Sequence, residues 1–116
     1  MLSLATMKGD RLGEFEELTL LAVAGLGSDA YGVAVQLLLE KEMRREVSMG
    51  AVYAALERME RKGFLDSSLG EATASRGGKR KRLFSVTPLG QRTLRDVRRT
   101  REALWTAASA STRGRS

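Results

Sequence analysis

Residues 48–64 form the most constrained stretch of this 116-residue chain, because they mark one complete helix with a signal at each end. The hydroxyl of Ser48 can cap the start by accepting a hydrogen bond from a backbone N–H of the first turn. Gly63 suits the position after the last turn, where the backbone often becomes left-handed. Apolar residues recur between them at helical spacing, at Val52, Ala55, Leu56 and Met59. The sequence therefore predicts a helix with one buried face.

The opposite side of this helix is small near its start, apart from one tyrosine. A narrow helix end whose N–H groups point forward can approach a bulky anion closely. By itself the pattern is more typical of an ordinary core helix, but the flanking segments favour a DNA recognition helix. Two interpretations stay open for Tyr53, a phosphate contact or packing over the preceding helix. Two also stay open for Arg58, a contact with the DNA backbone or a pair with a neighbouring glutamate. The candidate DNA contacts on this helix are Ser48, Met49, Gly50, Tyr53, Ala54 and Arg58.

Charge is distributed unevenly along the chain. Residues 1–75 hold 8 Lys and Arg against 12 Asp and Glu, whereas residues 76–116 hold 12 against 2, and the net charge is +6. A local excess of positive charge is typical of proteins that bind phosphate-rich partners. Charge alone is equally compatible with an ordinary solvated surface.

Two further helices are expected before Ser48. Residues 12–26 carry apolar side chains at helical spacing, with glutamates in the first turns. Residues 31–45 repeat the pattern, with Asp29 as the expected N-cap. The connection at residues 46–47 is short, so the second helix and the helix after Ser48 are expected to form a helix-turn-helix.

The hydrophobic pattern changes to that of a β-hairpin after Gly63. Residues 64–69 and 81–86 are the expected strands, and the loop between them ends in basic residues. A helix-turn-helix followed by a hairpin is a winged helix. Basic side chains on such a wing can neutralise DNA phosphates. The candidate wing contacts are Arg76, Gly77, Gly78, Lys79, Arg80 and Lys81.

A last helix is expected to begin at Thr87 and Pro88, as N-cap and first helical residue, and to run to about Ala108. Its apolar stripe extends beyond what a three-helix core can cover, which indicates a dimer interface. Trp105 could instead line an effector pocket, although a lone tryptophan on an apolar stripe more often belongs to a dimer core. The candidate dimerisation residues are Phe15, Leu94, Val97, Leu104 and Trp105.

These elements predict a mainly α fold with a small β-hairpin, which is a winged helix-turn-helix followed by a long C-terminal helix. The expected organisation is a flexible N-terminal arm over residues 1–11 and a DNA-binding domain over residues 12–87. A dimerisation helix over residues 88–108 and a disordered tail over residues 109–116 complete the chain.

The chain resembles the PadR-like family of winged-helix transcriptional regulators. The resemblance is carried by residues 12–16, 30–33, 47–53, 56–63, 76–78 and 87–90, which follow one another in the family's order. It implies a dimeric DNA-binding regulator, usually a repressor, that dimerises through its C-terminal helix. Relatives sense aromatic or drug-like molecules near the dimer helices.

The resemblance also implies roles for individual residues. Ser48, Gly50 and Tyr53 match the front of the family's recognition helix. The wing of the family is matched by Arg76, Gly77, Gly78 and Lys81. The chain departs from the family after the wing, where two aromatic residues are common but Leu83 and Phe84 stand here.

Enzymatic chemistry is not indicated. The chain has no histidine and no cysteine, so the usual general base, the usual zinc ligands and disulfides are absent, and we expect no metal and no cofactor. Gly78 and Lys79 resemble the end of a phosphate-binding loop, but Arg80 replaces its Ser/Thr and Thr73 its first glycine. The lack of cysteine fits a cytoplasmic protein, and no apolar run is long enough to span a membrane.

The sequence leaves two functions to compare. The first is a dimeric, sequence-specific repressor that binds an inverted-repeat DNA operator and is relieved by a small aromatic or drug-like ligand. The second is a winged-helix protein-interaction module whose basic face meets an acidic partner. The small, uncharged front of the helix after Ser48, coupled to a basic wing, suits a DNA groove better than a flat protein surface.

Overall fold

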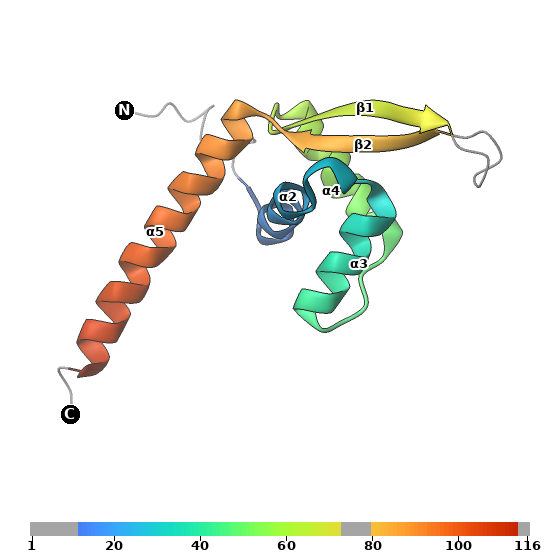
Figure 1. Ribbon diagram of the computed structural model, residues 1–116. Helices are drawn as coiled ribbons and strands as arrows, with labels where there is room; N and C mark the ends of the chain where they lie inside the picture. Colours follow the sequence, from blue (N-terminus) through green and yellow to red (C-terminus); the bar gives the residue numbers. More distant parts are fainter. Residues whose placement is uncertain (1–11, 73–79, 114–116) are drawn as a thin grey trace.

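The computed structural model describes residues 12–72 and 80–113 of the chain. Three helices and a two-stranded sheet are packed together, and a long fourth helix extends away from them (Figure 1). In chain order the elements are α2 (Glu14–Leu26), the 3₁₀ turn η1 (Gly27–Asp29), α3 (Gly32–Met43), α4 (Met49–Arg61), β1 (Leu65–Ala72), β2 (Arg80–Val86) and α5 (Pro88–Arg113). The predicted fold class, a mainly α winged helix with a small hairpin and a long C-terminal helix, is confirmed.

The core lies between α2, α3, α4 and the hairpin. It contains the predicted apolar stripe of α4, all of whose members are buried, together with aliphatic residues of α2 and α3 and the hairpin's Leu65 and Phe84. Strands β1 and β2 pair antiparallel, from Leu65 opposite Val86 to Ala72 opposite Arg80, with an irregular register between Leu69 and Ala72. Packing of one apolar face from each element thus fixes how the helices and the hairpin lie.

The hairpin is tied to the segment before α3. The backbone N–H of Phe84 donates to the carbonyl oxygen of Ala30 at 2.8 Å, and Tyr31 forms an isolated antiparallel bridge with Leu83. The base of the wing therefore has a fixed position relative to the start of α3.

Three of the expected helix ends, at Ser48, Gly63 and Thr87, are where the sequence places them. The Ser48 hydroxyl accepts a hydrogen bond from the backbone N–H of Ala51 at 3.0 Å. Gly63 follows α4 with a φ of +86°. The Thr87 hydroxyl accepts from Gly90 N–H at 3.0 Å and donates to the carbonyl oxygen of Gly63 at 2.6 Å. Thr87 therefore joins the end of α4 to the beginning of α5.

Three expectations about helix ends are wrong. Asp29 does not cap α3, because residues 27–29 form η1 and Tyr31 occupies the N-cap without a side-chain hydrogen bond. Helix α3 ends at Met43 rather than at residue 45, since Arg44 adopts a left-handed conformation with a φ of +56°. Helix α5 does not end at Ala108 but continues to Arg113, so residues 109–113 are helical rather than disordered.

The turn between α3 and α4 is held by side chains of α3. Gln36 Nε2 donates to the carbonyl oxygen of Val47, and Glu40 Oε2 accepts from the N–H of the same residue, both at 2.9 Å. Val47 itself is buried. These contacts fix the direction in which α4 begins.

Helix α5 is buried against the rest of the molecule in its first turns, and farther along Arg101 makes an exposed ion pair with Glu17 of α2. Gly90 is buried, and Leu94 lies partly buried against the core. From Arg98 to Ser111 every residue is exposed. Among the described residues, no helix combines the length and the apolar character needed to cross a membrane.

Candidate nucleic-acid interface

The start of α4 is narrow and accessible. Ser48, Gly50 and Ala54 are exposed, and Met49 is half-buried. A Cβ added to Gly50 would have no neighbouring atom within 4 Å, so nothing else in the described structure fills this space. Because the first N–H groups of a helix carry a partial positive charge, this end of α4 can approach a phosphate or a base edge closely.

Tyr53 packs over the start of α3. A Cβ added to Gly32 would lie 2.5 Å from the Cζ atom and 2.9 Å from the Cε1 atom of the Tyr53 ring. The ring therefore fits only because residue 32 has no side chain. Of the two interpretations that the sequence left open for Tyr53, packing over the preceding helix is confirmed. The side chain is still 42% exposed, so packing leaves part of it open to a ligand.

Tyr31 and Lys81 continue the exposed surface of Tyr53 as far as the wing. The Lys81 ammonium lies 3.7 Å from the centre of the Tyr31 ring, a cation–π contact. Tyr31 precedes Gly32 in the chain and bridges to Leu83 of β2. Tyr53 of α4, Tyr31 before α3 and Lys81 of β2 thus lie on adjoining elements. The sequence argument did not name Tyr31 as a site residue, although this residue lies in the block 30–33 that resembles the family.

The other described wing cations contact the hairpin itself or α4. Arg80 donates from Nε to the carbonyl oxygen of Gly70 at 2.6 Å and from Nη2 to that of Leu69 at 3.2 Å, where the strand register is irregular. Arg82 donates to Glu60 Oε1 at 2.7 Å and to the Ser67 hydroxyl at 3.1 Å, which ties β2 to α4. The remaining wing candidates, Arg76, Gly77, Gly78 and Lys79, lie outside the described residues.

Arg58 makes an ion pair inside the protein. Its Nε donates to Oε2 of Glu16 at 2.9 Å, and Lys62 Nζ donates to both oxygens of the same carboxylate at 3.1 and 3.2 Å. Burial of Glu16 raises the pKa of its carboxyl, but hydrogen bonds from Gly13 N–H, Arg58 and Lys62 outweigh this effect, and the net pKa is lowered. Of the two interpretations for Arg58, the structure has the pair with a glutamate. The partner is Glu16 of α2, so this side chain holds α4 against α2.

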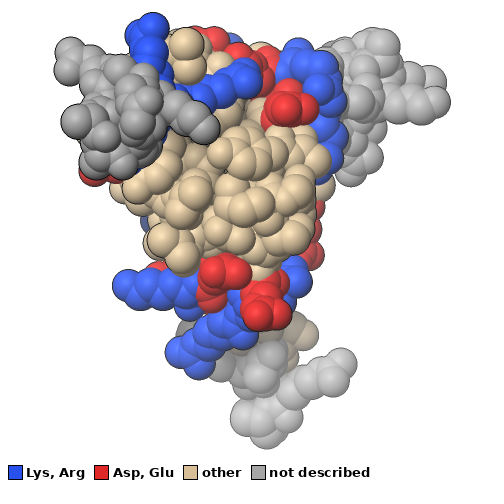
Figure 2. Space-filling view, turned by 90° about the vertical axis from the view of Figure 1, so that its right-hand side faces the viewer, with Lys and Arg blue, Asp and Glu red and all other residues tan. Residues whose placement is uncertain are grey.

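Figure 2 shows the side of the molecule on which α3 and the outer end of the hairpin lie in Figure 1. The described residues in the middle of this face are uncharged, and charged side chains gather above and below them. Two apolar residues of α3, Val33 and Leu37, are 47% and 58% exposed. The charged side chains at the margins of this face are of both signs, and its centre is uncharged (Figure 2).

The candidate dimerisation residues fall into two groups. Phe15 and Leu94 pack partly against the core, so much of their apolar surface is already covered. Val97 is half-buried, whereas Leu104 and Trp105 are 64% and 72% exposed. Large apolar side chains exposed on a projecting helix are typical of an interaction surface.

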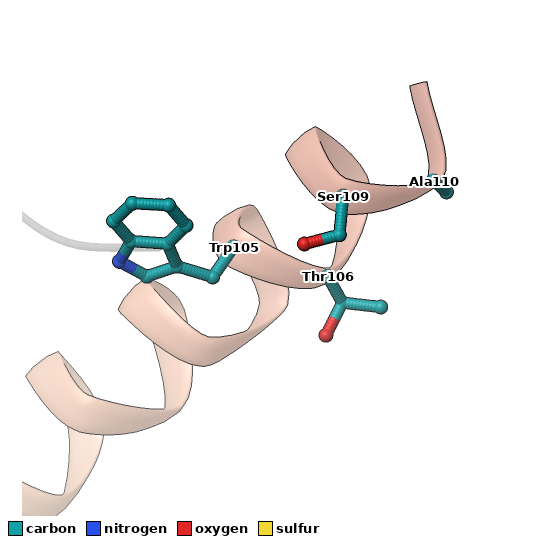
Figure 3. Close-up of a pocket in the computed structure, with 4 residues that line it drawn as sticks. All are labelled: Trp105, Thr106, Ser109 and Ala110. Atoms are coloured by element: carbon teal, nitrogen blue, oxygen red, sulfur yellow. The ribbon is translucent and has the colours of Figure 1, made fainter. Parts of the chain in front are cut away.

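The candidate effector pocket at Trp105 is a depression on the surface of α5. Figure 3 shows the four residues that line it, Trp105, Thr106, Ser109 and Ala110, all on this helix. A wall made by one helix covers only one side of a ligand, so a closed pocket here needs a second element. Within residues 12–72 and 80–113, no cluster of Cys, His, Asp or Glu is arranged to hold a metal ion.

Comparison with known proteins identifies the family. No curated protein sequence matches the chain. Among solved structures, a PadR-like transcriptional regulator from Bacillus cereus is 20% identical, with a TM-score of 0.68, and the match covers 93% of this chain and 96% of that one. A PadR-like transcription factor from Bacteroides fragilis is 22% identical, with a TM-score of 0.66, covering 97% and 96%. The complex structure of hsRosR-S4 is 23% identical, with a TM-score of 0.60, covering 93% and 97%.

At these identities the solved structures establish a shared fold. The family itself is established by the model of the "Transcriptional regulator PadR-like family", which matches residues 20–96, about two-thirds of the chain. The resemblance seen in the sequence motifs is confirmed. The chain belongs to the PadR-like family of transcriptional regulators, whose members are not enzymes.

Proposed function

We propose that this protein is a dimeric, sequence-specific transcriptional repressor that reads an inverted-repeat operator with the start of α4. The observation that carries the proposal is the narrow, capped start of α4 beside the surface formed by Tyr53, Tyr31 and Lys81. This arrangement offers a groove-sized helix end together with donors for phosphates on either side of it. We propose that the protein acts on DNA in the cytoplasm.

In the proposed complex, α4 enters the major groove with its first two turns. Met49, Gly50 and Ala54 are small or apolar, so they can approach base edges and thymine methyl groups without leaving a buried charge unpaired. The hydroxyl of Tyr53 and the ammonium of Lys81 would donate to phosphates, which fixes the register of the helix but carries no sequence information itself. The wing cations outside the described residues, Arg76 and Lys79, would add to these backbone contacts.

The proposed dimer forms through the exposed stripe of α5. Leu104 and Trp105 are the most exposed large apolar side chains of this helix. A two-fold dimer presents two α4 helices to two half-sites, about 34 Å apart for one turn of duplex. Binding across a promoter would then block transcription, which is how a repressor of this kind acts.

We further propose that a small aromatic or drug-like ligand relieves repression at Trp105. The indole is 72% exposed and lines a depression walled by α5 alone, so the partner's helix would supply the opposite wall. The same residue would then serve both as dimer contact and as ligand contact.

Selection from a random duplex pool, followed by binding measurements at several salt concentrations, tests the proposal. We expect the recovered sequences to contain an inverted repeat. The logarithm of the affinity should fall linearly with the logarithm of salt concentration, with a slope of about one unit per phosphate contact. A chain that binds acidic proteins but recovers no common DNA sequence would instead be the winged-helix interaction module.

A further inference from the structure

Two consecutive carboxylates in the first turn of α2 bind two different helices. Glu16 accepts hydrogen bonds from Arg58 and Lys62 of the region around the end of α4. Glu17 accepts from Arg101 of α5, with Nη2 to Oε1 at 2.8 Å and Nε to Oε2 at 3.0 Å. We propose that this turn fixes the angle between α4 and α5, and that the Glu17–Arg101 pair thereby sets the half-site spacing that a dimer accepts. The proposal rests on the dimeric operator binding proposed above.

Of the two carboxylates, Glu16 makes the more rigid contact. Glu16 is 6% exposed, and its carboxylate also accepts a hydrogen bond from the backbone N–H of Gly13 at 2.9 Å. A buried carboxylate with several donors keeps one geometry, because any rearrangement would leave a buried charge without partners. The first turn of α2 is therefore fixed relative to α4.

Glu17 contacts α5 far from the start of that helix. Arg101 is the fourteenth residue of this helix, so it lies about 20 Å from its start at 1.5 Å per residue. The start of α5 is fixed by Thr87 and by Gly90, where a Cβ would lie 2.7 Å from Val86 Cγ1. Two separated points of attachment define the direction of a helix. The bidentate geometry of the Arg101 contact adds directional precision to the second point.

This direction matters for the proposed dimer because its contact residues lie still farther out. Leu104 is about 24 Å from the start of α5, so a tilt of about 10° would displace it by about 4 Å. Successive base pairs are about 3.4 Å apart. Without the Glu17–Arg101 contact, the distance between the two α4 helices of the dimer could therefore vary by about the length of one base pair.

The test compares half-site spacings. The half-site recovered from a random pool by the wild-type protein is placed in duplexes as an inverted repeat, with spacers that increase one base pair at a time. Affinity is measured for each spacer and for a single half-site, using Arg101→Ala, Glu17→Gln, the double variant and wild type. Arg98→Ala is the matched control, because it removes the same charge from the same helix but breaks only a pair with Glu102 within α5.

We expect Arg101→Ala and Glu17→Gln to broaden the spacing profile alike, although they change the net charge in opposite directions. The affinity ratio between the best spacer and one two base pairs longer should fall by about fivefold or more, as for a modest coupling between sites. The double variant should broaden no further than either single variant. Half-site affinity and the melting temperature should stay close to wild type, as should the whole profile of Arg98→Ala.

An unchanged spacing profile in Arg101→Ala and Glu17→Gln, with a clear preference in wild type, would overturn this inference and leave the proposed function standing. An equally broad spacing profile in Arg98→Ala would also overturn the inference. The loss of a positive charge on α5, rather than the loss of the Glu17–Arg101 contact, would then explain the effect. A wild-type protein without any preferred spacing would overturn both the inference and the proposed dimeric binding.

Discussion

Tyr53 of α4 crosses Gly32 of α3 so closely that a Cβ at residue 32 would lie 2.5 Å from the ring's Cζ atom. No real Cβ sits this near a ring carbon, so residue 32 must be glycine for the two helices of the helix-turn-helix to keep this packing. The contact links the residue that begins α3 to the tyrosine on the front of α4. Any side chain at residue 32 would have to displace that tyrosine.

Gly32→Ala is therefore expected to displace the half-exposed Tyr53 ring and to weaken DNA binding, with a loss of stability below about 1 kcal/mol because the ring can move toward solvent. Gly25→Ala is the matched control, because Gly25 also lies within a helix but a Cβ there meets no atom within 4 Å. That variant should gain about 0.5–1 kcal/mol, since alanine favours a helix over glycine. Chemical denaturation of both variants measures the difference. If Gly32→Ala and Gly25→Ala had the same free energy of unfolding, Tyr53 would move aside at no cost.

The contrast between Gly32 and Ser48 shows what the sequence could and could not predict. The caps at Ser48 and Thr87 and the left-handed Gly63 act within a few residues of themselves, so these roles are readable from local sequence. The partner of Gly32 is 21 positions away and the partner of Glu16 is 42 positions away. Such contacts depend on how the helices pack, which the hydrophobic pattern specifies only as a buried face.

The errors in the predicted helix ends have local causes as well. Asp29 is a favourable cap in isolation, but the chain forms η1 at residues 27–29 before turning into α3. Residues 109–113 contain neither glycine nor proline, and alanines around Ser109 favour a helix, so α5 continues past Ala108. Serine disfavours a helix only weakly, so Ser109 and Ser111 do not end α5.

Gly50→Glu is expected to abolish DNA binding and leave the fold intact. The new carboxylate would stand where α4 must approach phosphates, and it meets no atom of the described structure near the Cβ position. In the first turn of a free helix an acidic side chain is mildly stabilising, so the melting temperature should be equal or higher. Binding to the selected operator and thermal unfolding give the two readouts.

Gly50→Gln separates bulk from charge, because it has nearly the same shape without the carboxylate. We expect it to bind more weakly than wild type but better than Gly50→Glu at low salt. Operator binding retained by a folded Gly50→Glu protein would falsify the assignment of α4 as the recognition helix.

Glu16 makes the stability of the protein dependent on pH in the acid range. Its hydrogen bonds lower the pKa of the folded carboxyl below the ordinary value of 4.5. Its contribution is therefore fully present above that ordinary value and is lost as the pH falls through the lower folded-state pKa. Glu16→Gln should reduce the free energy of unfolding at pH 7 by about 1–3 kcal/mol, the range for hydrogen bonds to a charged group.

Denaturation of Glu16→Gln and wild type across pH 2–7 checks this expectation. The difference between them should be largest at neutral pH and shrink as the pH falls through the folded-state pKa of Glu16. Glu102→Gln provides the control, because its exposed pair with Arg98 should contribute less than about 0.5 kcal/mol. If the free energy of unfolding differed between Glu16→Gln and wild type by the same amount at every pH, the charge of the carboxylate would not be what stabilises the contact between α2 and α4.

The exposed stripe of α5 is expected to form the dimer, and the dimer is expected to give specificity. Leu104→Arg combined with Trp105→Glu places charges where apolar side chains would meet, so this variant should sediment as a monomer. It should retain only weak, salt-sensitive binding without sequence preference, because one winged helix keeps the phosphate contacts but loses the second half-site. Trp105 is the only tryptophan in the chain, so in the wild-type protein its fluorescence should shift to the blue as concentration rises and the dimer forms.

Leu37→Arg tests whether replacing any exposed leucine with arginine would disrupt the dimer. Leu37 of α3 is 58% exposed, close to the 64% of Leu104, but it lies on a different helix. We expect that variant to remain dimeric by sedimentation. A dimeric Leu104→Arg/Trp105→Glu protein, or one that binds the operator as tightly as wild type, would show that α5 is not the interface. The dimer surface would then have to be sought at residues 12–26, where Phe15 is only partly buried.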